Sequence, residues 1–287
     1  MKKLMRRTSS FLHTHPVFRL ILLISIPLTW LVTIYIGSLT GLLQTGLYSV
    51  DTFTGKVNET YTFETIKEVF TDPLYYRITL RTIFIASVVT IIDIAIAYPV
   101  SFFITFVLKA KHQKFAVAVI VMPLWASYIV KQFAWRQILD PSSGILKKYF
   151  GFSPGFGMTA MIITLAYLWL PFVIIPIQAG MRKIPVNLLD ASSDLGAKTP
   201  RTTRKIITPL VFPSIVAASI FSFALTLGDY FAATLVGGGK VQVIGLNIYK
   251  SYLGSQKPSA AVFALFPIII MVAYLIGAKF TGALEEL

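Results

Sequence analysis

The chain has 287 residues, of which 55% are hydrophobic and only 13% charged, and its mean hydropathy is +0.74. Water-soluble domains carry charge on about a quarter of their residues, so this composition excludes one and indicates a membrane protein. A membrane β-barrel is also excluded, because barrel strands alternate over roughly 10 residues while the apolar runs here are hydrophobic on every side. The net charge of +14 would favour nucleic acid binding in a soluble protein. In a membrane protein it sets the topology, and no nucleic acid partner is expected.

Six apolar runs have about the 20 residues that cross ~30 Å of hydrocarbon as a helix. The first follows four basic residues, as a signal peptide does, but it exceeds the ~7–15 apolar residues of a cleaved signal and no Ala-x-Ala site follows it. We therefore expect it to remain as an anchor. The sequence predicts an all-α membrane protein with six transmembrane helices over residues 18–39, 79–108, 115–139, 157–181, 209–236 and 260–281.

The distribution of charge predicts the orientation of these spans. The short loop 109–114 is half lysine, so the positive-inside rule places it in the cytoplasm together with both chain termini. The loop after the first span, which would then be exterior, holds five of the twelve acidic residues: Asp51, Glu59, Glu64, Glu68 and Asp72.

Prolines are frequent inside the predicted spans. Each removes a backbone donor and bends its helix, which a bundle tolerates when its neighbours satisfy the freed carbonyls. Bent helices favour a transport bundle over a simple anchor, although proline is also generally common in membrane helices. The prolines are Pro27, Pro99, Pro123, Pro171, Pro176 and Pro267.

One cytoplasmic loop, residues 182–208, is long enough to have a structure of its own. Pro185 opens a first short helix and Gly196 stands where a left-handed cap is expected. A second short helix follows, with Pro200 in its first turn. Two delimited helices in so short a loop predict a defined shape, whereas the alternative is a basic loop that only sets orientation.

This loop resembles the cytoplasmic loop of ATP-binding-cassette (ABC) importer permeases. That family has the pattern Glu-Ala-Ala, three residues, Gly, nine residues, Ile-x-Leu-Pro. Here Asp190-Ala191-Ser192, Gly196, Ile206 and Pro209 stand at the same spacing, with Asp for Glu, Ser for the second Ala and Thr208 for Leu. The resemblance implies a helix that couples the permease to an ATPase. The expected coupling residues are Leu188, Leu189, Asp190, Ala191, Ser192, Asp194, Leu195, Gly196, Ile206 and Pro209.

The resemblance continues beyond the loop, from about residue 72 to the end, and is similar to the spermidine/putrescine type of permease. It implies the type I importer fold, with residues 1–71 as a tail, first span and exterior loop and residues 72–287 as a five-helix transport core. Other members of the subgroup carry iron or aminophosphonates, so the cargo stays open. The segments that carry the resemblance are Asp72-Pro73-Leu74-Tyr75, Tyr98-Pro99, Pro123-Leu124-Trp125, Leu170-Pro171-Phe172, Gly228-Asp229-Tyr230 and Leu235-Val236-Gly237-Gly238.

The sequence lacks the elements that an enzyme would need. A nucleotide-binding loop requires Gly-x-x-x-x-Gly-Lys-Ser/Thr. Its nearest candidate, Gly238-Gly239-Lys240, has Thr234 for the first Gly and Val241 for the hydroxyl. We expect no ATP hydrolysis and no cofactor in this chain, and assign ATP and Mg²⁺ to a partner ATPase.

Catalysis and metal binding within the chain are also disfavoured. The absence of cysteine excludes disulfides and thiolate sites. The three histidines, His13, His15 and His112, lie in cytoplasmic segments without an acidic cluster, so no metal site is expected. An intramembrane aspartyl protease, with two opposed aspartates in the spans, is the enzyme alternative, but their flanking residues do not support it.

Two aspartates inside the spans are the clearest indication of a substrate pathway. An aspartate at mid-membrane costs about 2.5–3.5 kcal/mol on insertion scales, so it should face protein or water. Asp93 continues a polar stripe with Thr90, and Asp229 continues one with Thr226 and Ser222. Such stripes suit a cationic solute, although pairing with Lys131 or Arg136 would make either aspartate structural.

Aromatic residues at similar levels could supply cation–π contacts to an ammonium group, or could simply pack between helices and anchor in the membrane interface. Those expected to line the pathway are Trp125, Tyr128, Trp169 and Tyr230, while Tyr167 and Phe231 lie at similar levels.

Together these features predict a non-enzymatic permease subunit of an ATP-driven importer in the cell inner membrane, which moves a small solute, polyamine in the first place, by alternating access. The family resemblance implies three partners beside the bilayer: an ABC ATPase dimer, a second homologous permease and an exterior solute-binding protein. The alternative from another class is an unpowered channel or sensor.

Overall fold

The computed structural model describes residues 16–51, 56–254 and 256–282, and this part of the chain is helical apart from one short hairpin and connecting turns. In the hairpin, β1 (Ser49–Val50) pairs antiparallel with β2 (Val57–Asn58). His13 and His15 lie outside the described residues. The helices are α2 (Pro16–Gly46), α3 (Glu64–Thr71), α4 (Pro73–Phe102), α5 (Ala110–Val121), α6 (Tyr128–Leu139), α7 (Ile145–Phe150), α8 (Met158–Arg182), α9 (Val186–Asp194), α10 (Thr199–Thr202), α11 (Thr208–Leu227), α12 (Phe231–Leu235), α13 (Ile244–Leu253), α14 (Lys257–Phe263) and α15 (Leu265–Lys279).

Five stretches of the described chain are long and apolar enough to cross a membrane, and a bent pair brings the number to six if it is one span. α4 begins at Pro73, six residues before the predicted start at residue 79, because Asp72 accepts a hydrogen bond from the Leu74 N–H at 2.7 Å and Pro73 occupies the first helical position. The five stretches are Leu23–Gly46, Pro73–Val107, Met158–Arg182, Thr199–Leu227 and Lys257–Lys279.

The third apolar run departs from the sequence prediction. Residues 115–139 form two helices, α5 and α6, that meet at 91°, and not one continuous helix. Pro123 lies in a short 3₁₀ turn, Met122–Trp125, and Ala126 and Ser127 then adopt extended backbone. Proline cannot donate to the helical ladder, so the run breaks here.

The fifth run also ends earlier than the predicted residue 236. α11 stops at Leu227, and the separate short helix α12 follows after a turn through Gly228 and Asp229. The last span starts at Lys257, three residues before its predicted limit, with Pro258 in its first turn and an interruption at Ala264 between α14 and α15.

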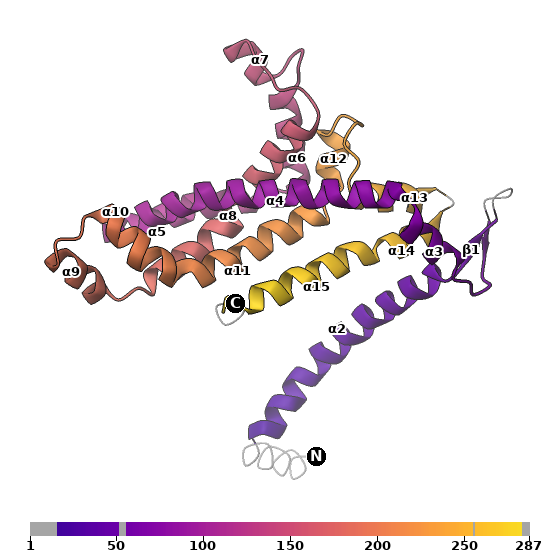
Figure 1. The fold of residues 1–287 in the computed structure, drawn as a ribbon, viewed down its shortest axis with the longest axis horizontal. Coiled ribbons are helices and arrows are strands. Elements are labelled where there is room, and N and C mark those ends of the chain that lie inside the picture. Colours follow the sequence, from indigo (N-terminus) through magenta and orange to yellow (C-terminus); the bar gives the residue numbers. More distant parts are fainter. Residues whose placement is uncertain (1–15, 52–55, 255, 283–287) are drawn as a thin grey trace, which may run out of the picture.

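Three long helices form the centre of the bundle: α4, α8 and α11 lie side by side along its longest axis (Figure 1). α8 and α11 approach closely because Gly180 has no side chain; a Cβ there would lie 2.2 Å from the Ser214 Oγ. Tyr98 and Thr208 join α4 to the start of α11 by a hydroxyl–hydroxyl contact of 2.6 Å. These contacts hold the three helices together at the end of the bundle that carries α9 and α10 (Figure 1).

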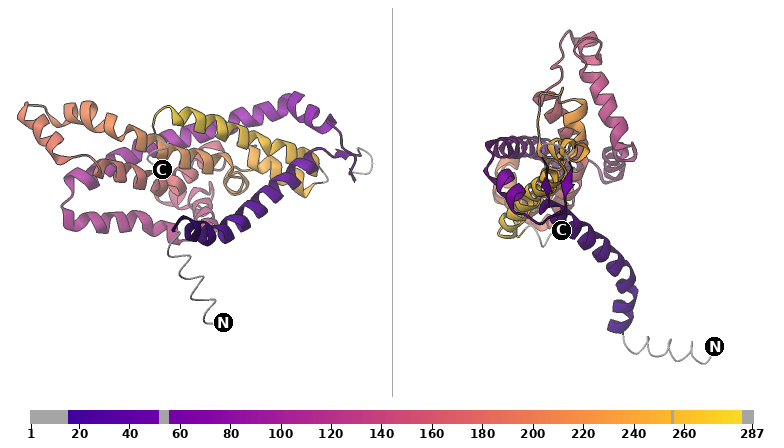
Figure 2. Two further views of the ribbon diagram at one scale, coloured as in Figure 1. Left: turned by 90° about the horizontal axis from the view of Figure 1, so that it is seen from below. Right: turned by 90° about the vertical axis from the view of Figure 1, so that its right-hand side faces the viewer.

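α2 behaves differently from the central helices. It contacts α14 near its carboxyl end and then diverges from the rest of the bundle (Figures 1 and 2). The 18-residue apolar stretch that makes α2 hydrophobic enough to cross a membrane has no residue buried inside the chain. Its apolar surface is therefore left for lipid or another protein.

α6 and α7 project to one side of the bundle (Figure 1). Asp140 ends α6 and holds the turn that follows, accepting hydrogen bonds from the Ser143 N–H at 2.8 Å, the Ser142 hydroxyl at 2.7 Å and the Ser142 N–H at 2.9 Å. These bonds favour the ionised form and lower the pKa of Asp140 to about 2.

Candidate functional site

The loop between α8 and α11 contains the two short helices that the sequence predicts, α9 and α10. Gly196, at φ +72°, ends the first one. The Gly196 N–H donates to the Ser193 carbonyl at 2.8 Å and the Ala197 N–H to the Ser192 carbonyl at 3.0 Å. A residue with a Cβ is disfavoured in this left-handed conformation, so the glycine fixes the turn.

The two faces of α9 differ. Ser192 is buried and shares a hydroxyl–hydroxyl contact of 2.8 Å with Thr202 of α10, and Leu189 packs against the core. The opposite face is exposed, with 88% of the Leu195 surface accessible. The structure therefore leaves Leu188, Asp190, Ala191, Asp194, Leu195 and Gly196 open to a partner, while Ile206 is half-buried and Pro209 lies exposed in the first turn of α11.

The first predicted pathway aspartate lies between two central helices. Asp93 of α4 is 0% exposed, and its Oδ2 accepts a hydrogen bond from Ser222 of α11 at 2.5 Å. Thr90, one turn away, lies 3.4 Å from the same serine hydroxyl. The Asp93 Oδ1 and the Thr226 hydroxyl, both buried, have no partner among the described residues. The structure thus brings Asp93, Thr90 and Ser222 together as a polar contact between α4 and α11, and Thr226 lies one turn further along α11.

The second aspartate lies at the break between α11 and α12. Asp229 is 8% exposed, and its Oδ1 accepts the Ala232 N–H at 2.8 Å, which caps α12. Its Oδ2 accepts the hydroxyl of Tyr128, the first residue of α6. Neither aspartate has a hydrogen bond to Lys131 or Arg136 in the described structure, and Arg136 donates instead to the Leu235 carbonyl at 3.1 Å.

Aromatic rings surround the Asp229 site. Tyr128 stacks on Trp169 of α8, with ring centroids 5.7 Å apart and planes at 11°, and the centroid of the Phe231 ring lies 6.1 Å from that of Tyr128. Tyr230 stacks on Tyr249 of α13 at 4.7 Å. Trp125, by contrast, is 89% exposed at the α5–α6 bend and joins no ring contact among the described residues. Three of the four predicted aromatics therefore gather near Asp229.

Sequence reasoning missed Gln132. This residue of α6 is 0% exposed, and its Nε2 donates to the Tyr128 hydroxyl at 2.9 Å. It stands four residues after Tyr128, so the two share a helix face. An amide at that spacing in an apolar run was the available signal.

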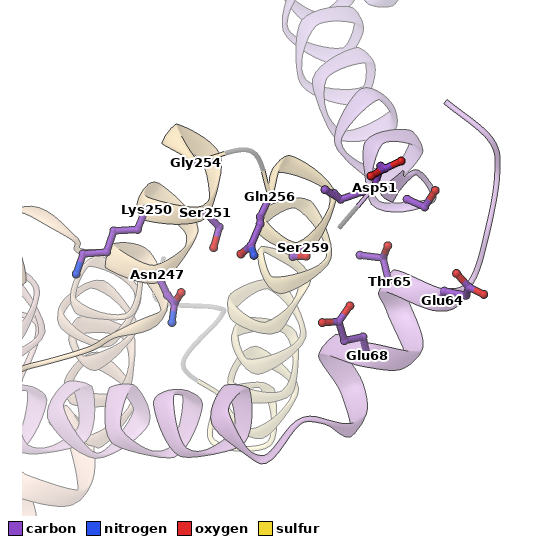
Figure 3. Close-up of a pocket in the computed structure, with 12 residues that line it drawn as sticks. Asp51, Glu64, Thr65, Glu68, Asn247, Lys250, Ser251, Gly254, Gln256 and Ser259 are labelled. Carbon is purple, nitrogen blue, oxygen red and sulfur yellow. The ribbon is translucent and has the colours of Figure 1, made fainter. Parts of the chain in front are cut away.

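A polar cavity opens at the opposite end of the bundle from α9. Its volume is about 750 Å³, and it lies between β1 and α3 on one side and α13 and α14 on the other. Figure 3 shows Thr65 and Glu68 of α3 facing Ser251 and Gln256 across it. Asp51 and Glu64 also line it.

The fold matches ABC transporter permeases of known structure. A chain of the bacterial alginate ABC transporter, solved with an alginate pentasaccharide-bound periplasmic protein, superposes with a TM-score of 0.75 over 96% of this chain and 97% of that one, at 15% identity. A chain of the MetNI methionine ABC transporter in an inward-facing conformation gives 0.60 over 73% and 95%, at 19% identity. The architecture is thus that of an ABC transporter's membrane-spanning subunit.

Residues 71–281 match the family model described as binding-protein-dependent transport system inner membrane component. The chain belongs to this family, and it is a multi-pass inner-membrane permease component. It is 36% identical to the inner membrane ABC transporter permease protein YdcU of Escherichia coli K12, over 98% of this chain and 95% of YdcU. It is 28% identical to the spermidine/putrescine transport system permease protein PotB of Haemophilus influenzae, over 74% and 78%.

Proposed function

We propose that this permease imports a polyamine of the putrescine or spermidine type by alternating access, powered by a separate ABC ATPase dimer. The observation that supports this cargo most directly is the Asp229 site, where a carboxylate at a break in a span is surrounded by aromatic rings. Such a site suits an organic ammonium group. Similarity to PotB supports the same class of cargo.

The orientation follows from the two ends of the bundle. The α9–α10 end carries the basic residues Arg182, Lys198, Arg201, Arg204 and Lys205, and we place it in the cytoplasm together with both termini. The polar cavity between α3 and α13 then lies outside, where its carboxylates would attract cations. A solute-binding protein would deliver cargo at that end, and a second homologous permease would complete the pathway.

The coupling element in this proposal is the α9 helix. Its exposed face, with Leu188 and Leu195, would sit in a groove of the ATPase, and motion of the ATPase would move α8 and α11. Because the loop is short and Gly196 fixes its turn, the push would be transmitted rigidly.

Replacing Gly196 by Trp tests the coupling role. The left-handed conformation would add about 1–2 kcal/mol of strain, and the indole would obstruct the exposed face, so we expect uptake of radiolabelled putrescine to fall at least about tenfold while the amount of permease in the membrane is unchanged. Gly282 is a matched control, at φ +73° with open space around it, and Gly282→Trp should transport normally. Normal uptake by Gly196→Trp would refute the coupling role.

The cargo is tested with the complete transporter in cells that lack their own polyamine importers. Uptake of radiolabelled putrescine or spermidine, stimulated by ATP hydrolysis, is the expected result. Uptake of iron or an aminophosphonate without polyamine uptake would overturn the proposed cargo but leave the ABC permease assignment intact. Transport that continues without the ATPase would instead indicate an unpowered channel.

A further inference from the structure

Gln132, Tyr128 and Asp229 form a hydrogen-bond chain with a fixed direction. The Tyr128 hydroxyl donates a hydrogen bond to the Asp229 carboxylate, so its oxygen must act as the acceptor toward Gln132. The Gln132 Nε2 therefore faces the hydroxyl, and the orientation of the amide is determined by its partners. The other end of the amide, the Gln132 Oε1, takes no part in these hydrogen bonds.

That oxygen is buried and unsatisfied. Gln132 is fully enclosed, and its Oε1 has no hydrogen-bond partner among the described residues. Buried amide oxygens are nearly always paired, because leaving one without a donor is unfavourable. The site thus has an acceptor without a donor, the Gln132 Oε1, on the same amide that binds the Tyr128 hydroxyl.

The chemistry of the missing donor follows from its surroundings. Asp229 supplies a negative charge, and Gln132 Oε1 and the Tyr128 oxygen supply two neutral acceptors. A primary ammonium has three donors, no acceptor and a positive charge, so its chemistry matches a carboxylate with neutral acceptors nearby. The Tyr128–Trp169 ring pair adds an aromatic surface suited to a cation. A carboxylate or phosphate would instead be repelled by Asp229.

We propose that Gln132 is a specificity-determining residue that receives a terminal ammonium group of the cargo together with Asp229. In the conformation described here the Tyr128 hydroxyl occupies the place on Asp229 that the ammonium takes. Entry of the cation releases Tyr128 from Asp229, which removes one of the contacts between α6 and the α11–α12 break. This inference rests on the proposed polyamine cargo.

The test measures the concentration dependence of radiolabelled putrescine uptake by the complete transporter. Gln132→Leu removes the acceptor at similar size, and loss of one hydrogen bond to a charged group should raise KM about tenfold. Gln132→Glu loses the donor toward Tyr128 but keeps an acceptor at the same position and adds a negative charge, so the KM for the cation should not rise. Gln137→Leu is the matched control, because Gln137 lies exposed on the same helix.

The outcomes separate this inference from the proposed function. A raised KM in Gln132→Leu, with maximal rate and membrane abundance retained and Gln137→Leu unchanged, supports the ammonium site. An unchanged KM, or a loss confined to maximal rate and abundance, would overturn it and assign Gln132 a structural role while polyamine transport stands. If the unchanged transporter does not take up putrescine or spermidine at all, the proposed cargo fails and the ammonium site fails with it.

Discussion

The two aspartates that continue polar stripes in the sequence have different environments in the structure. Asp93 is enclosed between two continuous helices, α4 and α11, and accepts a hydrogen bond from Ser222. Asp229 lies where a helix has ended, between backbone that it caps and a tyrosine hydroxyl. Irregular backbone at membrane depth is tolerated only against protein or a water-filled path. From this comparison we expect Asp93 to hold α4 and α11 together, and we expect Asp229 to be the aspartate that meets the solute in the proposed function.

Asp229→Asn should give the largest effect on transport. The amide keeps the size of the carboxylate and an acceptor for the Ala232 N–H, but removes the negative charge that would bind the cation. Loss of a charged partner is worth about 1.5–3 kcal/mol, so KM for putrescine should rise about tenfold or more. The measurement is uptake at graded putrescine concentrations. A KM equal to that of the unchanged protein would mean that the Asp229 carboxylate does not bind the cation.

Changes at Asp93 should act on stability and much less on KM. Asp93→Leu leaves the Ser222 hydroxyl buried without its acceptor, which should cost about 1–3 kcal/mol and lower the unfolding temperature of the purified protein. Asp93→Asn retains an acceptor and should leave KM for putrescine essentially unchanged. A large rise in KM for Asp93→Asn would place this residue in the pathway as well.

Ser222→Ala should have the smallest effect. It removes one hydrogen bond to Asp93, worth about 0.5–1.5 kcal/mol, and leaves uptake kinetics unchanged. The double variant with Asp93→Leu, which removes the acceptor, checks whether the two residues act together, since their effects on thermal unfolding should be less than additive. Additive effects would mean that the Ser222–Asp93 contact contributes nothing to stability.

Much of the fold could be predicted from the sequence, because apolar runs of span length are local signals. The start of α4 at Asp72-Pro73 was missed, because the prediction followed the apolar run from residue 79 and not the helix cap. The end of the short helix α9 could also be predicted, because it depends on the left-handed backbone conformation that Gly196 adopts. The 91° angle between α5 and α6 could not be predicted. Pro123 indicates a bend, but the size of the angle depends on the extended backbone at Ala126 and Ser127.

The candidate site could be predicted only in part, because contacts between distant segments are not local signals. Asp229, Tyr128 and Trp169 were each identifiable as unusual residues in a span, but their meeting depends on the α5–α6 bend. The same bend leaves Trp125 exposed. Gln132 was missed because its importance arises from its neighbours and not from its own type.

The close approach of Gly180 to Ser214 limits how this molecule can change shape. Since not even a methyl group fits between α8 and α11 at that point, only glycine at position 180 allows the two helices this spacing. We expect α8 and α11 to move together, with the interruption after Leu227 as the place where α11 can bend. A displacement of α9 would then reach the region beside Asp229 through both helices.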